Sequence, residues 1–454
     1  MKENINKLKE IAKEKLEFLK LRPYENEVLA ISSNSINYSE EVESCFYKIF
    51  ENLNIDESIK KLYEGKIVNI TESRPALHHT YRKNKKEFIK DINELEDYIN
   101  SKGYKTLISL GIGGSYEGPN LLNEFFSTMK AQKYKRISIL GPDEEEFRFK
   151  MQSVNLNESC FIVSSKSLST IETLNSYDLA KKLLADNGIT DKKIKDHFMT
   201  ITSDEHKAKK LGFNNTNTLL FPESVGGRYS IWSPISYISA LENQEYFLDF
   251  LEGGKLVDNL LFSDKDFYDS LKRICFLDLW NSNFLNKETR LIFSYSWPLR
   301  SIPSYFQQLE MESLGKRPSK KSYFSKTGQT IFGGFGPKAQ HSLFQHVHQG
   351  TAQLCVDLIS MSASGGDKAI NQHQANAQIS LFSSNRKKFK NKKYQVNGDI
   401  PNTHWLLKEK SGKSLGFLIA FWELRVFINA CMLQINPFDQ FGVEAGKELT
   451  DSKI

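Results

Sequence analysis

The segment Ser164–Thr173 carries hydroxyl, ammonium and carboxyl side chains directly after a short apolar run. Several of its hydroxyls and Lys166 stand where a helix is predicted to begin. Hydroxyl donors, a cation and the free amides of a helix start together suit an anion such as a phosphate. One hydroxyl would be enough to cap the helix. Because there are several, we favour a phosphate site over a simple cap.

A second candidate is the glycine-rich turn Gly111–Pro119, which also follows a strand and precedes a helix. Backbone amides at such a turn can point at an anion. Tyr116 stands where a dinucleotide-binding fingerprint needs its third glycine, and no Gly-Lys-Ser/Thr follows as in a Walker A loop. A ligand site and a tight turn without a ligand both remain open for this turn.

The segment Ser224–Ser233 places Arg228 between a glycine pair and an aromatic stretch. A guanidinium held rigidly there could stabilise a developing enediolate oxygen. The alternative is a structural ion pair.

The segment Tyr305–Ser313 contains a candidate general base, Glu312. Gln308 and Glu312 are four residues apart and share one face of the predicted helix, whereas Glu310 points elsewhere. Apolar and amide neighbours could tune Glu312 for proton transfer. Simple solvent exposure is the alternative.

Three histidines fall within the predicted helix Gln340–Gln349, which invites a metal hypothesis. His346 and His348 diverge on a helix, and no H-E-x-x-H motif occurs. His341 and His348 share a face but lie two turns apart, too far to hold one ion. We expect no metal site, and we interpret His341 as an acid/base group and the other two as structural.

Short apolar runs that lead into loops or helices alternate along the chain and must position these groups. This rhythm predicts an α/β fold with parallel sheets covered by helices on both faces. The segments expected as strands are 106–110, 136–140, 160–164, 198–202, 218–221, 290–294, 329–332 and 353–359. We expect a helical N-terminal segment at 1–95 that packs on the large domain, a first sheet domain at 96–240, and a second at 241–454 with a helical C-terminal segment.

The chain has 454 residues, a formal net charge of +6, and 39% hydrophobic and 26% charged residues. This composition is that of an ordinary globular protein, and the length favours two packed domains. The basic run Arg386–Lys393 could contact nucleic acid, but we interpret it and the stretch Lys316–Lys326 as surface loops. We expect no nucleic-acid partner. A mild positive charge would help attract an anionic substrate.

The N-terminus and the longest apolar region bear on where the protein works. Residues 1–21 lack the uninterrupted apolar core of a signal peptide. The apolar region Leu415–Ile435 is broken by Glu423, Arg425 and Asn429, which predicts a buried helix rather than a membrane span. The five cysteines are scattered and odd in number, which favours free thiols in a reducing compartment. We therefore expect a cytoplasmic protein without a membrane partner.

The ordered set of motifs closely resembles the glucose-6-phosphate isomerase (phosphoglucose isomerase) family. The resemblance runs from residue 69 to residue 447, and the ordered set is specific although no single motif is. It rests on N-I-T-E-S-R at 69–74 with L-H at 77–78, the glycine turn at 111–115, the Ser/Lys/Thr loop at 165–173, V-G-G-R-Y-S at 225–230, Q-Q-L-E-M-E-S at 307–313, Q-H-S at 340–342 and N-P-F-D-Q with G-V-E-A-G-K at 436–447.

The resemblance implies two sugar-isomerase (SIS) domains, each a mainly parallel sheet sandwiched by helices in three αβα layers. It implies a homodimer whose active sites are shared between subunits. The implied activity interconverts D-glucose 6-phosphate and D-fructose 6-phosphate, in glycolysis and gluconeogenesis, by ring opening and a cis-enediolate, without a cofactor.

The resemblance also implies roles for single residues. Glu312 would shuttle the proton between C2 and C1, and Arg228 would stabilise the enediolate. His341, oriented by Glu172 and donated by the neighbouring subunit, would open the ring together with Lys447. The implied substrate-binding residues are Ser165, Lys166, Ser167 and Thr170 at the 6-phosphate, Gly114 and Ser115 along the sugar, and Gln308 and Gln440 at hydroxyls or phosphate.

Some residues depart from the family pattern, and two further functions stay open. Ser167 and Ser169 stand where threonines are usual, a change that keeps the hydroxyls. The segment Gly141–Glu146 lacks the Asn and Asp-Gly common there. A dual isomerase that also accepts mannose 6-phosphate is one alternative. A catalytically silent sugar-phosphate sensor is the other, and the presence of the predicted base and ring-opening pair disfavours it.

Overall fold

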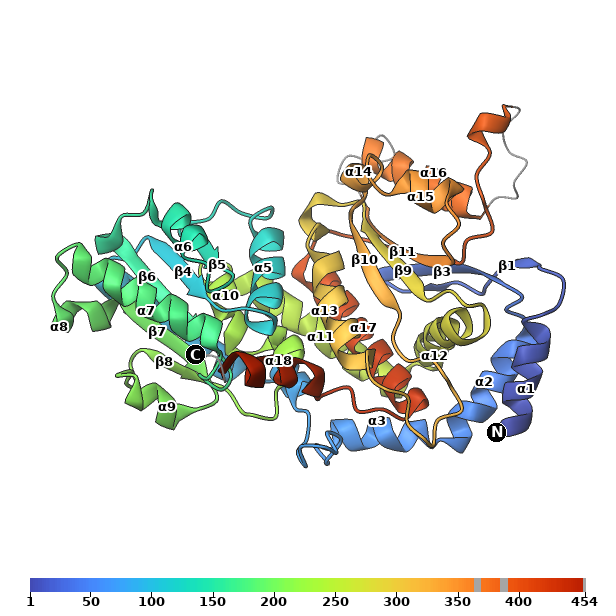
Figure 1. Ribbon diagram of the computed structural model, residues 1–454, viewed down its shortest axis with the longest axis horizontal. Coiled ribbons are helices and arrows are strands. Elements are labelled where there is room, and N and C mark those ends of the chain that lie inside the picture. Colours follow the sequence, from blue (N-terminus) through green and yellow to red (C-terminus); the bar gives the residue numbers. More distant parts are fainter. Residues whose placement is uncertain (363–368, 384–390, 452–454) are drawn as a thin grey trace. The chain divides into compact units, whose positions relative to one another are not determined.

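Parallel strands surrounded by helices form the centre of both parts of this chain (Figure 1). The computed structural model describes residues 1–362, 369–383 and 391–451. They divide into two compact units. Unit 1 consists of Met1–Ala76 and Glu252–Ile454, and unit 2 consists of Leu77–Leu251.

Unit 2 is built on a five-stranded sheet in the order β5-β4-β6-β7-β8, in which all neighbouring strands are parallel. β6 and β7 are buried along their whole length, which is why they are continuous apolar runs rather than alternating ones. The strands are β4 (Thr106–Leu110), β5 (Lys135–Ile139), β6 (Ser159–Ser164), β7 (Phe198–Thr202) and β8 (Thr218–Leu220). The helices are α4 (Lys85–Lys102), α5 (Gly114–Phe126), α6 (Glu144–Met151), α7 (Ile171–Asp186), α8 (Asp191–Ile194), α9 (Glu205–Lys210) and α10 (Tyr237–Ala240).

One core of unit 2 lies between this sheet and the helices α6 and α7. Ile108 and Phe161 of the sheet pack there with Phe147 of α6 and Leu184 of α7, and all four are almost fully buried. Burial of this apolar surface is the main force that holds the helices on the sheet. Short 3₁₀ helices complete the unit at His78–Lys83 (η1) and Gly227–Trp232 (η4).

Unit 1 is built on a seven-stranded mixed sheet in the order β1-β3-β12-β11-β9-β10, with β2 paired to β3. β12, β11, β9 and β10 are parallel to one another, whereas β3 runs antiparallel to β12, β1 and β2. The strands are β1 (Phe18–Lys20), β2 (Tyr24–Glu25), β3 (Leu29–Ile36), β9 (Thr289–Ser294), β10 (Thr330–Phe335), β11 (Leu354–Met361) and β12 (Asn402–Leu407).

The helices of unit 1 come from both ends of the chain. The chain passes into this unit within α11 (Gln244–Ser263). The others are α1 (Lys2–Ile11), α2 (Glu40–Asn52), α3 (Ile55–Tyr63), α12 (Lys265–Leu279), α13 (Ile302–Leu314), α14 (Gly336–Ala339), α15 (Phe344–Gln349), α16 (Ile370–Phe382), α17 (Gly412–Leu433) and α18 (Phe441–Asp451).

All eight runs expected as strands form strands, with ends shifted by three residues at most, and the predicted α/β fold class is confirmed. Residues 18–36 depart from the helical period expected for the N-terminal segment, because β1 to β3 lie there. β12 has no counterpart among the expected strands because its first half is polar. Its Thr403 and His404 are satisfied inside the sheet by Ser33 and Ser360, at 3.1 and 2.6 Å.

The apolar region Leu415–Ile435 forms the buried helix that its charges predict. α17 is long and apolar enough to cross a membrane, but 94% of its most apolar window is buried inside the protein. It is buried on nearly every side, Glu423, Arg425 and Asn429 included, as expected of a helix enclosed by the core. The cysteines are free thiols, as predicted: Cys45, Cys160, Cys275 and Cys355 are buried and Cys431 is half-buried. Part of the basic run, residues 386–390, lies outside the described residues.

Candidate active site

The turn that joins β4 to α5 depends on glycine. Gly113 has φ of 55° and ψ of −125°, a conformation that favours glycine. A Cβ on Gly111 would lie 2.9 Å from the carbonyl oxygen of Ser164, at the end of β6. β4 and β6 are parallel neighbours, so their carboxyl ends meet at the same edge of the sheet. Ser115, in the first turn of α5, and Ser165 therefore start from adjacent strand ends.

A second close approach joins this turn to the segment that carries Arg228. A Cβ on Gly114 would lie 2.1 Å from the carbonyl oxygen of Gly227 and 2.8 Å from the amide nitrogen of Arg228. Only a residue without a side chain fits here. Ser230 strengthens η4 locally by donating to the Gly227 carbonyl at 2.6 Å. The backbone of Arg228 is thus held beside the glycine turn, and the residue is only 2% exposed.

The loop after β6 keeps its hydroxyls in pairs. Ser165 Oγ lies 3.1 Å from Thr170 Oγ1, and Ser167 Oγ lies 2.6 Å from Ser169 Oγ. Thr170 is the N-cap residue of α7, yet its side chain makes no bond to a helix amide. The capping alternative is therefore not realised at this helix. The hydroxyls converge at the carboxyl end of a buried strand and at a helix start, where an anion is stabilised.

The backbone of this loop is fixed from β7 and the residues that follow it. The carbonyl of Lys166 accepts hydrogen bonds from Thr202 Oγ1 at 2.9 Å and from the Ser203 amide at 2.9 Å. Leu168 is buried and has φ of 42°, a left-handed conformation that a side chain of this size rarely adopts. The neighbouring contacts therefore hold the loop in a specific shape, which a phosphate site requires.

Glu172 stands in the first turn of α7, two residues after Thr170. Its Oε2 atom is buried and has no hydrogen-bond partner among the residues that the structure describes. A carboxylate oxygen buried in this way needs a donor. A hydrogen-bond donor placed beside this oxygen would satisfy it.

α13 in unit 1 presents Gln308 and Glu312 on one face, as their spacing predicts. Nε2 of Gln308 donates a hydrogen bond of 3.1 Å to Oε1 of Glu312, and Glu312 is half-buried. Glu310 points away, also as predicted, and is 2% exposed. The helix therefore separates an accessible carboxylate from a buried one only two residues away.

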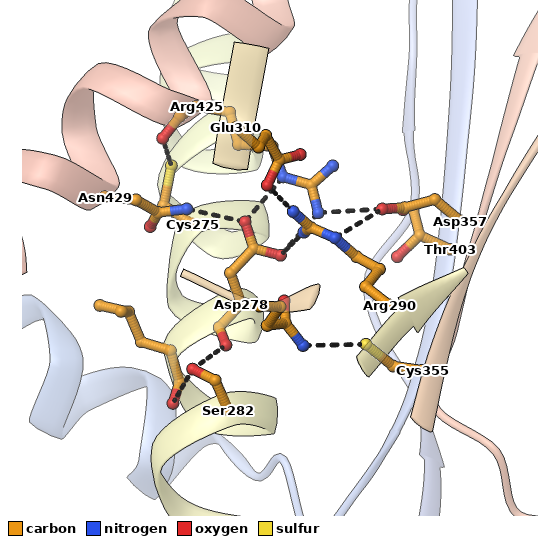
Figure 2. Close-up of polar contacts among 12 residues, drawn as sticks. Cys275, Asp278, Ser282, Arg290, Glu310, Cys355, Asp357, Thr403, Arg425 and Asn429 are labelled. Atoms are coloured by element: carbon orange, nitrogen blue, oxygen red, sulfur yellow. Dashed lines mark hydrogen bonds and ion pairs between the residues drawn. The ribbon is translucent and has the colours of Figure 1, made fainter. Parts of the chain in front are cut away.

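Glu310 belongs to a network of buried charges that fixes α13 against the sheet (Figure 2). Arg290 of β9 pairs with Glu310 and Asp278, and Trp422 Nε1 donates to Glu310 at 2.6 Å. Burial alone would raise the pKa of Asp278, but the guanidiniums of Arg290 and Arg425 hold it below its ordinary value. Charges buried this deeply are stable only when each has partners, and here the partners join α12, α13 and α17 to β9.

The histidine segment is not one continuous helix. Residues 340–343 form turns between α14 and α15, in which the amides of His341 and Ser342 bond to carbonyls three residues earlier. His341 is exposed in this turn. His348 is buried, its Nε2 lies 2.7 Å from Gln378 Oε1, and burial lowers its pKa. The described residues contain no group of three or more His, Cys, Asp or Glu placed to hold a metal.

The tail motif at 436–440 is bound to the early motif at 69–74. Asn436 Nδ2 donates to Asn69 Oδ1 at 2.8 Å and to Thr71 Oγ1 at 2.6 Å. Gln440 is the last residue of this motif, and Lys447 lies on α18. The side chain of Lys447 is outside the described part of the structure.

The predicted site residues fall into two sets. The turn at 113–115, the loop at 165–172 and Arg228 belong to unit 2 and converge at one sheet edge. Unit 1 carries the others, which are Gln308, Glu312, His341, Gln440 and Lys447.

Lys316 was expected in a solvated loop, and the structure corrects this: its side chain is 17% exposed and contacts both α13 and the tail. Its position four residues after Glu312 was the signal that could have shown this.

Parallel strands with polar loops at their carboxyl ends place this chain among the α/β proteins, in which ligands bind at that edge of a sheet. The family model for phosphoglucose isomerase matches residues 88–454. Over 427 residues the chain is 33% identical to the glucose-6-phosphate isomerase of Zymomonas mobilis, covering 89% of this chain and 83% of that protein. It is 29% identical to the enzyme of the same name from Shewanella halifaxensis, covering 90% and 84%. The chain belongs to the phosphoglucose isomerase family.

A solved structure shows the same fold. The crystal structure of a glucose-6-phosphate isomerase from Chlamydia trachomatis matches with a TM-score of 0.86 at 24% identity. The match covers 100% of this chain and 90% of that one. The two-sheet architecture is therefore that of a known isomerase.

Proposed function

We propose that this chain interconverts D-glucose 6-phosphate and D-fructose 6-phosphate. Family membership over most of the chain supports the reaction. The observation that carries the chemistry is α13, which presents Glu312 beside Gln308 while burying Glu310.

The loop at 165–170 binds the 6-phosphate. Ser165, Ser167 and Thr170 donate hydroxyl hydrogen bonds to its oxygens, and Lys166 adds positive charge. Their pairing at 2.6 to 3.1 Å supports this role, because the same oxygens can turn toward an anion between them. Gly114 and Ser115 line the sugar beside the phosphate loop.

Ring opening comes first. His341 and Lys447 move a proton from the C1 hydroxyl to the ring oxygen, which breaks the C1–O5 bond and frees the aldehyde. Glu172 orients His341 of the neighbouring subunit, and its buried, unpartnered Oε2 atom supports this arrangement. The active form is therefore a homodimer in which each site uses residues of both chains. We also propose that the enzyme works in the cytoplasm.

Proton transfer follows on the open chain. Glu312 removes the C2 proton, and the electron pair left behind forms the C1–C2 double bond as the charge moves onto O1. Arg228 stabilises this enediolate oxygen. Glu312 then returns the proton to C1 while the O2 proton passes to O1, which leaves a ketone at C2 and a hydroxyl at C1. Gln308 and Gln440 hold sugar hydroxyls or phosphate during these steps.

A coupled assay with purified protein tests the proposal. Fructose 6-phosphate is the substrate, and glucose 6-phosphate is detected through a dehydrogenase, with and without a chelator. We expect conversion that the chelator does not change, because the proposed steps move only protons. Absence of conversion would refute the function. A loss of activity with chelator that added metal restores would refute the cofactor-free mechanism.

A further inference from the structure

Lys316 lies between two elements that carry proposed site residues. It follows the end of α13, whose C-cap is Gly315. Its Nζ donates to the carbonyl oxygens of Glu312 and Ser313, the second at 3.2 Å. The same atom donates to the carbonyl oxygen of Asp439 at 2.8 Å and lies 3.5 Å from Asp439 Oδ1.

Asp439 is in turn fixed from its other side. Its Oδ2 accepts hydrogen bonds from Thr71 Oγ1 at 2.9 Å and from Asn436 Nδ2 at 3.0 Å. The Asp439 side chain is 8% exposed. The residue that follows it is Gln440, which we place at the substrate. A continuous series of contacts therefore connects the early motif to the tail and the tail to α13. Lys316 makes the last of these contacts, to the carbonyl oxygen of the proposed base.

An ordinary helix cap does not account for this geometry. A lysine that satisfies the last carbonyls of a helix needs only the contacts to α13. The Lys316 ammonium also contacts the backbone and the side chain of Asp439, which lies far away in the sequence. The ammonium therefore stands between two negative groups: the C-terminal carbonyls of α13 and the Asp439 carboxylate. Without it these groups would repel each other.

We propose that Lys316 is a positioning residue that sets the place of Glu312 relative to the tail carrying Gln440. This inference rests on the proposed function, because Glu312 must be the base for its position to affect the rate. Lys316 acts through Glu312 and takes no part in proton transfer. Misplacement of a catalytic group by about 1 Å can cost roughly 100-fold in rate, so a small shift of α13 against the tail is enough to be measured.

The test compares four variants with the unchanged protein. Lys316→Met keeps the aliphatic stem and removes the charge, and Lys316→Arg restores a cation. Asp439→Asn weakens the same contact from its other side. Lys326→Met is the matched control in the same basic stretch, because the Lys326 ammonium contacts Glu288 and Asn286, each at 2.7 Å, and neither is in α13 or the tail.

The readouts are kcat, KM, thermal stability and the kinetic isotope effect with glucose 6-phosphate deuterated at C2. We expect Lys316→Met to lower kcat about 10- to 100-fold while KM stays within about threefold. The isotope effect rises because proton transfer becomes slower than the other steps. Lys316→Arg recovers most of kcat, and Lys326→Met resembles the unchanged protein. The effects of Lys316→Met and Asp439→Asn are not additive, because the residues share one contact.

The inference is overturned if Lys316→Met keeps the unchanged kcat. It is also overturned if kcat falls with no change in the isotope effect, or only in proportion to the folded fraction. If Lys316→Met does not fold, Asp439→Asn decides by the same criteria. The activity of the unchanged protein separates the proposed function from the role of Lys316. If the unchanged protein converts no substrate, the proposed function fails. If it is active but the variants do not change the isotope effect, only the role of Lys316 is refuted.

Discussion

Nε2 of Gln308 donates a hydrogen bond of 3.1 Å to Oε1 of Glu312, one turn further along α13. The bond constrains the rotamers of the carboxylate from within its own helix. Glu310, on the opposite face, ties the same helix to the core through Arg290 and Trp422. Gln308 therefore holds the carboxylate of the proposed base, and Glu310 holds the helix that carries it against the core.

Replacing Glu312 by Gln should remove the proton-transfer step. The amide keeps the size and hydrogen-bonding capacity of the side chain but cannot accept the C2 proton. We expect kcat to fall by about 100- to 10,000-fold, with substrate affinity nearly unchanged. Turnover by the coupled assay and binding by calorimetry check this. Glu288→Gln, at a side chain 65% exposed, is the control, and normal turnover in Glu312→Gln would contradict the role.

Removing hydroxyls from the loop at 165–170 should weaken phosphate binding. Hydrogen bonds to a charged group contribute about 1.5–3 kcal/mol each, so Ser165→Ala should raise KM by about tenfold or more. We expect Thr170→Val to act in the same direction. Inhibition by inorganic phosphate should weaken in parallel. Ser127→Ala, at an exposed hydroxyl on the end of α5, should leave both quantities unchanged. Equal KM values for Ser165→Ala and this control would argue against the site.

Gly114→Ala should disturb the contact between the glycine turn and η4. The new Cβ would lie 2.1 Å from the Gly227 carbonyl, and backbone on both sides cannot yield easily. Overpacking of this kind costs about 1–3 kcal/mol. We expect a lower melting temperature and a lower kcat/KM, because Arg228 moves with Gly227.

Gly226→Ala is the matched control for this substitution. Its φ is −69°, and the nearest atom to its Cβ would be a Tyr229 ring carbon at 3.5 Å, an ordinary contact. We expect unchanged stability and kinetics. If both alanine variants behave alike, the close approach at Gly114 is not the cause.

Asp278→Asn should destabilise the protein by about 3–5 kcal/mol at neutral pH, because the guanidiniums of Arg290 and Arg425 each lose one of their buried counter-charges. The folded-state pKa of Asp278 is below the ordinary value of 3.8. Its stabilising effect is therefore complete above that pH and is lost as the pH falls through the lower folded value. Chemical unfolding at several pH values should show the difference between parent and variant shrinking below about pH 4. A constant difference would contradict the assignment.

Much of this protein follows from local sequence. The apolar runs at 106–110 and 198–202 became β4 and β7 with the expected bounds, because strands buried on both faces leave a continuous apolar signal. The spacing of Gln308 and Glu312 placed them on one helix face, since four residues make about one turn. The motif order was enough to indicate the family and the reaction.

Contacts between distant residues could not be predicted in this way. β3 pairs with β12 across more than 360 residues, and polar side chains such as Ser33 and Thr403 satisfy each other there, so neither strand looks apolar. In the sequence Lys316 is one of several lysines in a basic stretch, and only the structure shows that Asp439 lies beside it. Sequence determined which groups are present and which face each occupies, because these depend on neighbours along the chain. Only the tertiary structure decided which of them meet, because burial and pairing depend on residues brought together by folding.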